Sequence, residues 1–376
     1  MITEIKLHQF KCFEELHLPL SQLTLLSGTN ASGKSSVLQS LVLLHQTMHD
    51  HEWATRLMLN GKELKLGTVL DVVNKISGRH SLEIGIENAT DSYHWSFQGE
   101  RSEMSMGVDS VSVNGSKYKQ PDKLQFLAPD SEQSDLLQSI KNLTYITAER
   151  VGPREFYVLE DEQEVNTVGK SGEYAVGLLY LGRDKEVHQE LVLEGVPPTR
   201  LRQVEARMQL FFPGCGLTVQ KVEQSNAVTL GLRTSAETDY HRPIHVGFGL
   251  TQVFPVIVAA LSANKGDVIL IENPEVHLHP AGQALMGQFL AEISKVGVQI
   301  ILETHSDHVL NGIRRSVKSK LIEPDEIAIH FFRPSSEEAA QVHSPQLDEN
   351  GNLDAWPEGF FDQFDKDMDY FAGWGK

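Results

Sequence analysis

The sequence predicts an α/β fold, and three observations support this prediction. An apolar segment at 23–28 is followed by the pattern G-x-x-x-x-G-K-[ST] and then by a segment with helical character. Two fully apolar segments, 267–273 and 298–306, are joined by another helical segment. Residues alternate between apolar and polar at 2–20 and again within 81–115, which is typical of antiparallel strands. Together these features predict a parallel core sheet with helices and an antiparallel β lobe.

The composition is that of a globular protein. Its 376 residues suffice for one large domain or two ordinary ones, and 40% are hydrophobic while 22% are charged. No run of about eighteen apolar residues occurs, and the N-terminus lacks the apolar core of a signal peptide. The two cysteines, Cys12 and Cys215, are expected to be buried free thiols in a reducing cytoplasm, with a single disulfide left open.

The formal net charge of −18 argues against a chain dominated by nucleic-acid binding, because it repels phosphate backbones at long range. A local basic patch remains compatible with this charge. One candidate cluster consists of Arg314, Arg315, Lys318 and Lys320. A solvated helix face is the simpler interpretation of that cluster.

The N-terminal elements follow from their periodicity. Residues 2–10 and 14–20 alternate with period two and predict a hairpin, and 23–28 predicts a buried strand. Residues 34–48 predict a helix. Its apolar residues nearly encircle it, so we expect it to lie between other elements.

The middle of the chain predicts strands at 81–88, 92–98 and 110–115, and a short buried strand at 143–148. A helix at 197–214 follows the strand at 143–148, and two paired strands follow that helix, at 217–223 and 227–233. In the last third, the strands at 267–273 and 298–306 flank a helix at 281–297, and Gly297 is well placed to end that helix. This order predicts a right-handed crossover in a parallel sheet that is buried on both faces.

The pattern at the start of the first helix predicts a phosphate-binding loop. It is formed by Gly28, Gly33, Lys34 and Ser35. The glycines let backbone N–H groups turn inward, Lys34 reaches the outer phosphates, and Ser35 offers its hydroxyl to Mg²⁺. The nucleotide-binding residues expected from it are Gly28, Thr29, Asn30, Ala31, Ser32, Gly33, Lys34, Ser35 and Ser36. A second Gly-Lys-Ser, within 168–173, lacks the first glycine and the preceding strand, so we reject it.

Acidic and imidazole side chains follow the two apolar strands of the last third. Glu272 ends one strand, and Glu303, Thr304 and His305 end the next. The carboxyl ends of parallel strands meet at one edge of a sheet, where ligands bind. A Mg-nucleotide site requires a carboxylate at such a place. The sequence therefore predicts that the phosphate loop, Glu272 and His305 surround one triphosphate.

Three segments carry a family resemblance: GTNASGKSS, ILIENPEVHLHP and ILETHSDHVL. They resemble ATP-binding-cassette ATPases of the branch that holds the SMC, RecF and OLD-type proteins. The opening IKLHQFKCFEELHL is similar to the first hairpin of those heads. The resemblance extends from residue 2 to about 363, and bacterial ATPases with a C-terminal WPEGFFDQ-like appendage resemble this chain most closely.

The resemblance implies a fold and a set of roles. The fold would be a cassette-type P-loop NTPase with a mixed central sheet, an antiparallel β lobe and a helical insertion. ATP and Mg²⁺ would be the ligands, with Ser35 and Glu272 holding the metal and His305 sensing the γ-phosphate. Gly247, Gly249 and Thr251 would occupy the signature position and reach the nucleotide of a partner copy, although such a glycine turn by itself is equally often structural.

The sequence departs from this family at the residue after Glu272. The family usually has an acidic pair there, whereas Asn273 carries an amide, which cannot act as a carboxylate base. Two alternatives stay open. Either Glu275 or Glu303 orients the attacking water, or hydrolysis is slow and ATP acts mainly as a clamp.

The resemblance also implies partners: a second copy in a head-to-tail homodimer, and a separate effector such as a nuclease, in DNA processing or anti-phage defence. Binding of nucleic acid stays open. An ATP-gated scaffold with little turnover is the alternative function. A transporter subunit is disfavoured because the Leu-Ser-Gly-Gly-Gln signature is absent from the sequence, and a nuclease is disfavoured because no second acidic metal cluster is evident.

The expected domains are an ATPase domain at 1–335, with an inserted lobe at about 160–240, and an acidic appendage at 336–376. Within the appendage, the aromatic side chains are expected to dock on the body of the protein rather than on a partner. These are Trp356, Phe360 and Phe361.

Three further patterns have more than one interpretation. A zinc site is a minor possibility for His277, His279, His305 and His308. Residues 348–354 predict an Asn-Gly turn rather than a calcium loop, because glycine is at the fourth position instead of the sixth. Arg150 and Arg154 could contact a nucleotide or a partner, or form a structural ion pair.

Overall fold

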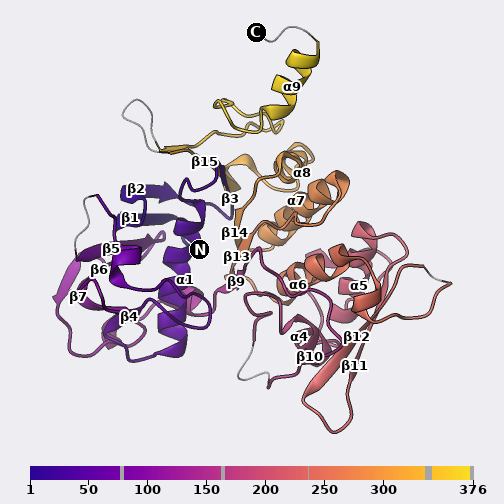
Figure 1. Cartoon of the computed structure of the whole chain (residues 1–376), viewed down its shortest axis with the longest axis horizontal. Helices are drawn as coiled ribbons and strands as arrows, with labels where there is room; N and C mark the ends of the chain where they lie inside the picture. The colour runs from indigo at the N-terminus through magenta and orange to yellow at the C-terminus, as the bar shows by residue number, and fades with distance from the viewer. Residues whose placement is uncertain (77–79, 162–165, 236, 335–340, 373–376) are drawn as a thin grey trace. The chain divides into compact units, whose positions relative to one another are not determined.

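A computed structural model describes the chain except for residues 77–79, 162–165, 236, 335–340 and 373–376. The chain divides into two compact units (Figure 1). The first unit comprises 1–143, 305–307 and 323–376, and the second comprises 144–304 and 308–322. The sequence-based boundary at 335/336 lies outside the described residues.

An antiparallel sheet forms much of the first unit. Its strand order is β2-β1-β5-β6-β7-β4, with β8 paired to β7. The strands are β1 (Glu4–Phe10), β2 (Phe13–Pro19), β4 (Arg56–Met58), β5 (Ser81–Glu87), β6 (Ser92–Gln98), β7 (Ser105–Val113) and β8 (Ser116–Lys119). Alternation places Tyr93, Trp95 and Phe97 of β6 in the core. The predicted hairpin and the strands at 81–88 and 92–98 are confirmed. The strand predicted at 110–115 is β7, which begins earlier, at Ser105, and ends at Val113, and β4 and β8 were not predicted.

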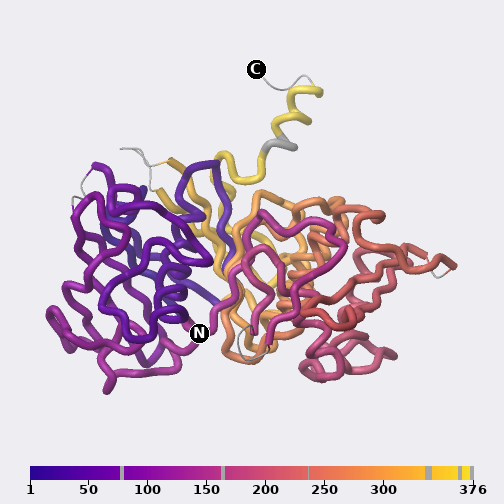
Figure 2. The backbone as a smooth tube through the Cα atoms, turned by 60° about the horizontal axis from the view of Figure 1, so that its bottom comes forward, coloured from indigo at the N-terminus to yellow at the C-terminus, as the bar shows by residue number. Residues whose placement is uncertain are grey.

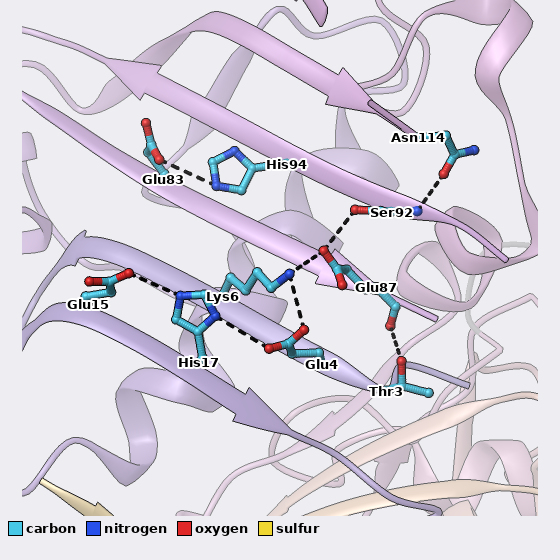
Figure 3. Close-up of polar contacts among 10 residues, drawn as sticks. All are labelled: Thr3, Glu4, Lys6, Glu15, His17, Glu83, Glu87, Ser92, His94 and Asn114. Carbon is cyan, nitrogen blue, oxygen red and sulfur yellow. Dashed lines mark hydrogen bonds and ion pairs between the residues drawn. The ribbon is translucent and has the colours of Figure 1, made fainter. Parts of the chain in front are cut away.

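The opposite face of this sheet carries polar side chains (Figure 3). Lys6 lies between Glu4 and Glu87, and Glu87 also accepts a hydrogen bond from Ser92 at 3.0 Å. The hydrogen bond with Glu87 raises the pKa of Lys6, and the same bond lowers the pKa of Glu87. These ion pairs are partly exposed, so they contribute little to the stability of the unit. They account for the polar residues in the alternating pattern of the strands.

An early strand and a late strand of the chain pair in the first unit. Strand β3 (Leu23–Gly28) pairs in parallel with β15 (Ile327–Phe332), which pairs with β16 (Val342–His343) (Figure 2). Helix α1 (Lys34–Asp50) follows β3, and most of its residues are buried, as its apolar circumference predicts. Helices α2 (Val69–Val72) and α3 (Asp135–Lys141) also belong to this unit.

A parallel sheet forms the centre of the second unit. Strand β13 (Val268–Glu272) lies between β14 (Gln299–Glu303) and β9 (Thr144–Ile146). Helix α7 (Pro280–Lys295) connects β13 to β14, and α8 (Asp307–Lys318) follows. Gly287 and Gly312 let α7 and α8 approach closely: a Cβ on Gly312 would lie 2.0 Å from the Ala284 carbonyl oxygen. The predicted strand–helix–strand unit with parallel strands is confirmed.

A smaller antiparallel sheet with helices completes the second unit. Its order is β10-β12-β11. The elements are β10 (Tyr157–Val158), α4 (Ala175–Leu181), α5 (Arg200–Phe211), β11 (Gly216–Lys221), β12 (Ala227–Arg233) and α6 (Phe248–Ser262). The pair β11–β12 and the helix α5 lie where the sequence predicts them.

The C-terminal segment, which belongs to the first unit, packs an aromatic side chain against β15. Phe360 is fully buried and meets Phe331 of β15 edge to face, with ring centroids 5.2 Å apart. Helix α9 (Gln363–Phe371) follows, with Phe371 80% exposed. Residues 348–352 form the predicted turn, in which Asp348 accepts hydrogen bonds from the N–H groups of Asn350 and Asn352.

Both cysteines are free thiols. Cys215 is buried as expected, but the expectation for Cys12 is wrong, because it is exposed in the turn between β1 and β2. In the described part of the chain, no helix is both long and apolar enough to cross a bilayer.

Candidate functional site

The loop between β3 and α1 requires glycine at two positions. Gly28 has φ +139°, and a Cβ there would lie 2.0 Å from the Phe332 carbonyl oxygen. Gly33 has φ +110°, and its Cβ would meet the Phe13 ring at 2.5 Å and the sulfur of Cys12 at 2.7 Å. The loop is therefore shaped by backbone conformation and by contacts with β15 and the first hairpin.

Lys34 begins α1 and is directed back into this loop. Its side chain is 3% exposed, and its Nζ donates hydrogen bonds to the carbonyl oxygens of Gly28 (3.1 Å) and Thr29 (2.8 Å). Gly33 is the N-cap, and no acidic residue occurs in the first turn of α1. An ammonium group beside the positive end of a helix suits an anion such as a phosphate.

A residue of the C-terminal segment also touches this loop. The side-chain amide of Gln341 donates to the Ser32 carbonyl oxygen at 3.3 Å. This contact could not be predicted from sequence patterns, because 309 positions separate the two residues.

His305 belongs to the same unit as Lys34. Burial lowers the pKa of His305, and the positive charge of Lys34 lowers it further. The ring is therefore neutral at physiological pH. The structure thus brings the predicted histidine within electrostatic reach of the phosphate-loop lysine.

The predicted carboxylates lie together in the second unit. Glu272 and Glu303 are register partners at the ends of β13 and β14. Glu303 is 7% exposed, whereas Glu272 is half-buried. That the loop, Glu272 and His305 share one ligand stays a prediction.

Two groups from the β9 region hold the carboxylate of Glu272. The Tyr145 hydroxyl donates to its Oε1 at 2.7 Å, and the Ala148 N–H donates to its Oε2 at 3.3 Å. The carboxylate thus has a fixed orientation, with both oxygens accepting hydrogen bonds. Tyr145 was missed as a site residue; its only signal was a hydroxyl-bearing residue in a strand predicted to be buried.

Asn273 adopts a left-handed conformation, with φ +43°. Its N–H donates to the Glu303 carbonyl oxygen at 2.8 Å, and its own carbonyl accepts from Val276 at 3.2 Å. Asparagine tolerates this conformation better than most residues. Asn273 therefore suits the turn after β13, whatever its part in chemistry.

The buried side chain of Arg150 binds the main chain of this turn. It is 7% exposed, and its Nη2 donates to the carbonyl oxygens of Glu272 (2.6 Å) and Asn273 (3.1 Å). Burial lowers the pKa of Arg150 to about 10, while the charges of Glu275 and Glu272 raise it. Of the two arginines considered from the sequence, Arg150 binds main-chain carbonyls, whereas Arg154 is exposed.

The predicted signature turn lies at the start of α6. Gly247 is the N-cap and is exposed, and Gly249 packs against the His277 carbonyl oxygen, where a Cβ would lie at 3.0 Å. Thr251 is 4% exposed and its hydroxyl donates to the Phe248 carbonyl oxygen at 2.9 Å. The Thr251 hydroxyl is therefore bonded within α6, whereas Gly247 is exposed to solvent.

The candidate zinc histidines have separate surroundings. His279 caps α7, with its Nδ1 accepting from the Ala281 N–H at 3.4 Å, and His277 meets the Phe248 ring edge to face at 5.1 Å. Within the described ranges, no group of three or more His, Cys, Asp and Glu side chains is arranged to hold a metal ion. Ser35 and Glu272 remain the candidates for a Mg²⁺ ion held together with a nucleotide.

Solved structures share this fold. A crystal structure of an SMC head bound to the C-terminal winged-helix domain of ScpA has a TM-score of 0.60 at 15% sequence identity, covering 93% of this chain and 98% of that one. An SMC head from Pyrococcus furiosus, with an extended coiled coil and bound to the C-terminal domain of ScpA, has a TM-score of 0.57 at 13% identity. The match covers 99% of this chain and 98% of that one.

The sequence matches lead to the same group. An OLD nuclease from Thermus scotoductus is 20% identical over an alignment of 361 residues, and the match covers 90% of this chain and 66% of that protein. A family described as AAA ATPase domain matches residues 1–174. A second AAA domain family, whose description names the AbiEii toxin of a type IV toxin–antitoxin system, matches residues 217–311. The chain is thus similar to AAA ATPase domains at 1–174 and 217–311, resembles an OLD nuclease along most of its length, and shares the fold of SMC heads. The fold of this group implies that it binds a nucleotide together with a metal.

Other matches cover less of this chain. A macrolide export ATP-binding/permease protein, MacB, from Wolinella succinogenes is 30% identical over 147 residues, which are 39% of this chain and 22% of that protein. A family described as protein of unknown function, DUF3696, matches residues 322–370. The chain spans less than two thirds of the length of both curated relatives.

Proposed function

We propose that this ATPase binds ATP with Mg²⁺ and hydrolyses it, acts as a head-to-tail homodimer, and controls a separate effector such as a nuclease. The observation that carries the proposal is the phosphate loop. Gly28 and Gly33 have no room for a side chain, and the ammonium group of Lys34 lies at the N-terminus of α1. This arrangement fits a triphosphate.

The residues of the proposed site would have different roles in nucleotide binding and hydrolysis. Backbone N–H groups of the loop and Lys34 would bind the phosphates, and Ser35 and Glu272 would hold Mg²⁺, which neutralises phosphate charge. Neutral His305 has one N–H donor for the γ-phosphate. Because Asn273 cannot accept a proton as a carboxylate does, Glu275 or Glu303 would orient the attacking water.

The start of α6 supports the proposed homodimer. Gly247 is exposed there, and two apolar side chains close to it in sequence, Ile244 and Phe248, are 43% and 47% exposed. A second copy that covered them would bring its nucleotide to the Gly247 turn. An effector nuclease, and a setting in DNA processing or anti-phage defence, are suggested by the likeness to the OLD nuclease and by the toxin named for the second AAA family.

Lys34→Ala tests the proposed function. Removal of the ammonium group is expected to weaken binding of ATP by at least about a hundredfold, because a charge-assisted contact to phosphate is lost in a buried setting. Calorimetric titration with Mg–ATP measures the affinity, and light scattering with and without ATP measures the dimer. Lys170→Ala is the matched control, since it removes the lysine of the second Gly-Lys-Ser. Undiminished binding by Lys34→Ala would disprove the proposal.

A second candidate function is an ATP-gated scaffold with little turnover. Asn273 favours it, because the residue after Glu272 supplies no carboxylate. Single-turnover measurement separates the two functions. Turnover on the order of 1 s⁻¹ supports an ATPase cycle, whereas tight binding with negligible turnover supports the scaffold.

A further inference from the structure

The segment 148–152 connects the acidic end of β13 to the first turn of α6, within the second unit. At one end, the Ala148 N–H and the Arg150 guanidinium bind the side chain and main chain of Glu272. Arg150 also binds the carbonyl oxygen of Asn273. The guanidinium therefore fixes two consecutive peptide groups of the turn that follows the proposed metal-binding carboxylate.

At its other end the segment contacts α6. The side-chain amide of Gln252, which is 2% exposed, donates to the Arg150 carbonyl oxygen at 3.4 Å. Gly152 lies against the ring of Phe248, where a Cβ would come within 2.8 Å of the ring edge. Phe248 and Gln252 are one helical turn apart at the start of α6, so the segment touches the turn that includes Gly249 and Thr251 at two points.

Two nitrogen atoms of the Arg150 guanidinium are not used in these contacts. Its Nε and Nη1 are buried, and neither has a hydrogen-bond acceptor among the residues that the structure describes. A buried donor without an acceptor is costly, so a rearrangement that supplies one is favoured. The charge of the Glu275 carboxylate raises the pKa of Arg150, so this carboxylate is close enough to be considered as an acceptor. A shift of the guanidinium toward Glu275 would give the contact a second arrangement, and coupling between two sites requires such a two-state element.

We propose that Arg150 is a positioning residue that couples the acidic end of β13 to the first turn of α6. Nucleotide bound beside Glu272 would thereby set the geometry of the exposed Gly247–Phe248 turn and make dimerisation depend on ATP. This coupling rests on the proposed function. A purely structural role would make Arg150 a stabilising contact and leave the response of α6 to nucleotide unchanged.

Hydrogen exchange of the first turn of α6 tests the coupling in the full chain. Adding Mg²⁺ and a non-hydrolysable ATP analogue to the wild type is expected to slow exchange at 248–253 at least about threefold. Arg150→Ala is expected to bind the analogue within about threefold of the wild-type affinity and to lose this slowing. Arg150→Lys, which keeps the charge and one donor, should recover part of it. Arg154→Ala is the matched control and should respond as the wild type does.

Gln252→Leu provides a second test that leaves Arg150 in place. It removes the contact to the Arg150 carbonyl oxygen, so it should keep the affinity for the analogue and reduce the slowing. Full slowing in both Arg150→Ala and Gln252→Leu would overturn the coupling. A loss of analogue binding in Arg150→Ala would also overturn it, because Arg150 would then act at the nucleotide itself. If the wild type did not bind the analogue, the proposed function itself would fail, and that result is distinct from both others.

Discussion

At the scale of single residues, the turn after β13 contains a position with two separate requirements, one for the chemistry of the side chain and one for the backbone conformation. The family resemblance predicts an acidic residue after Glu272, and Asn273 stands there instead. The structure supplies a conformational reason, because this residue has φ +43° and an asparagine accepts that conformation with little strain. The lost carboxylate and the left-handed turn are therefore separate properties of the same position.

Substitution of Asn273 tests this reading of the turn. Asn273→Ala is expected to lower the free energy of unfolding by about 1 kcal/mol, because alanine pays the steric cost of positive φ. Asn273→Gly should stay within about 0.5 kcal/mol of the wild type, since glycine has no Cβ. Urea denaturation measures both. Equal losses in the two variants would show that the side-chain amide, and not the backbone conformation, is what matters.

At the scale of elements, the strand–loop–helix unit at 23–50 was predictable almost completely. The apolar strand, the glycine spacing and the helical periodicity are local signals, and β3 and α1 begin where the sequence predicts. What the pattern did not reveal is why Gly28 is packed so tightly. It lies against the main chain of Phe332 in β15, a strand from the other end of the chain.

Gly28→Ala is expected to destabilise the first unit by about 3 kcal/mol, because it adds a clash with a main-chain atom to the cost of positive φ. Gly115→Ala is the matched control. Gly115 has φ +86° but nothing within 4 Å of a Cβ, so its cost should be about 1 kcal/mol. Denaturant unfolding of both variants measures the difference. Similar losses would mean that packing against β15 contributes little.

At the scale of the whole molecule, the chain is an acidic protein whose first unit is built from both termini. The net charge is −18, and β3 pairs with β15 across about three hundred residues. Two histidines are buried in this unit. His45 Nδ1 lies 2.9 Å from the Ile140 carbonyl oxygen, and His330 Nε2 lies 2.7 Å from that of Pro19. Each ring donates an N–H to a carbonyl, which raises its pKa, but the effect of burial is larger and favours the neutral ring.

The pH dependence of stability follows from these rings. Burial lowers the pKa of both His45 and His330 to about 4, below the usual 6.5. The unfolded chain therefore takes up these protons first, and each histidine costs up to about 3 kcal/mol of stability as the pH falls from about 6.5 to 4. Urea unfolding at pH 7, 6 and 5 should show this loss, and His45→Gln and His330→Gln should each have a shallower slope. Unchanged slopes in both variants would contradict the prediction.

Local sequence patterns were sufficient to predict the glycine-containing loop before α1, the two apolar strands with their terminal acids, and the hairpin at the N-terminus. These features are encoded by residues close together in the chain, because periodicity, glycine spacing and helix stops act over a few positions. Only the tertiary structure decided that Tyr145 orients Glu272, that Arg150 joins Glu272 to α6, and that Phe360 anchors the C-terminal segment. Tyr145 and Glu272 are 127 residues apart, and nothing local in either segment specifies its partner. Such contacts arise when strands and helices pack, which sequence patterns at single positions do not record.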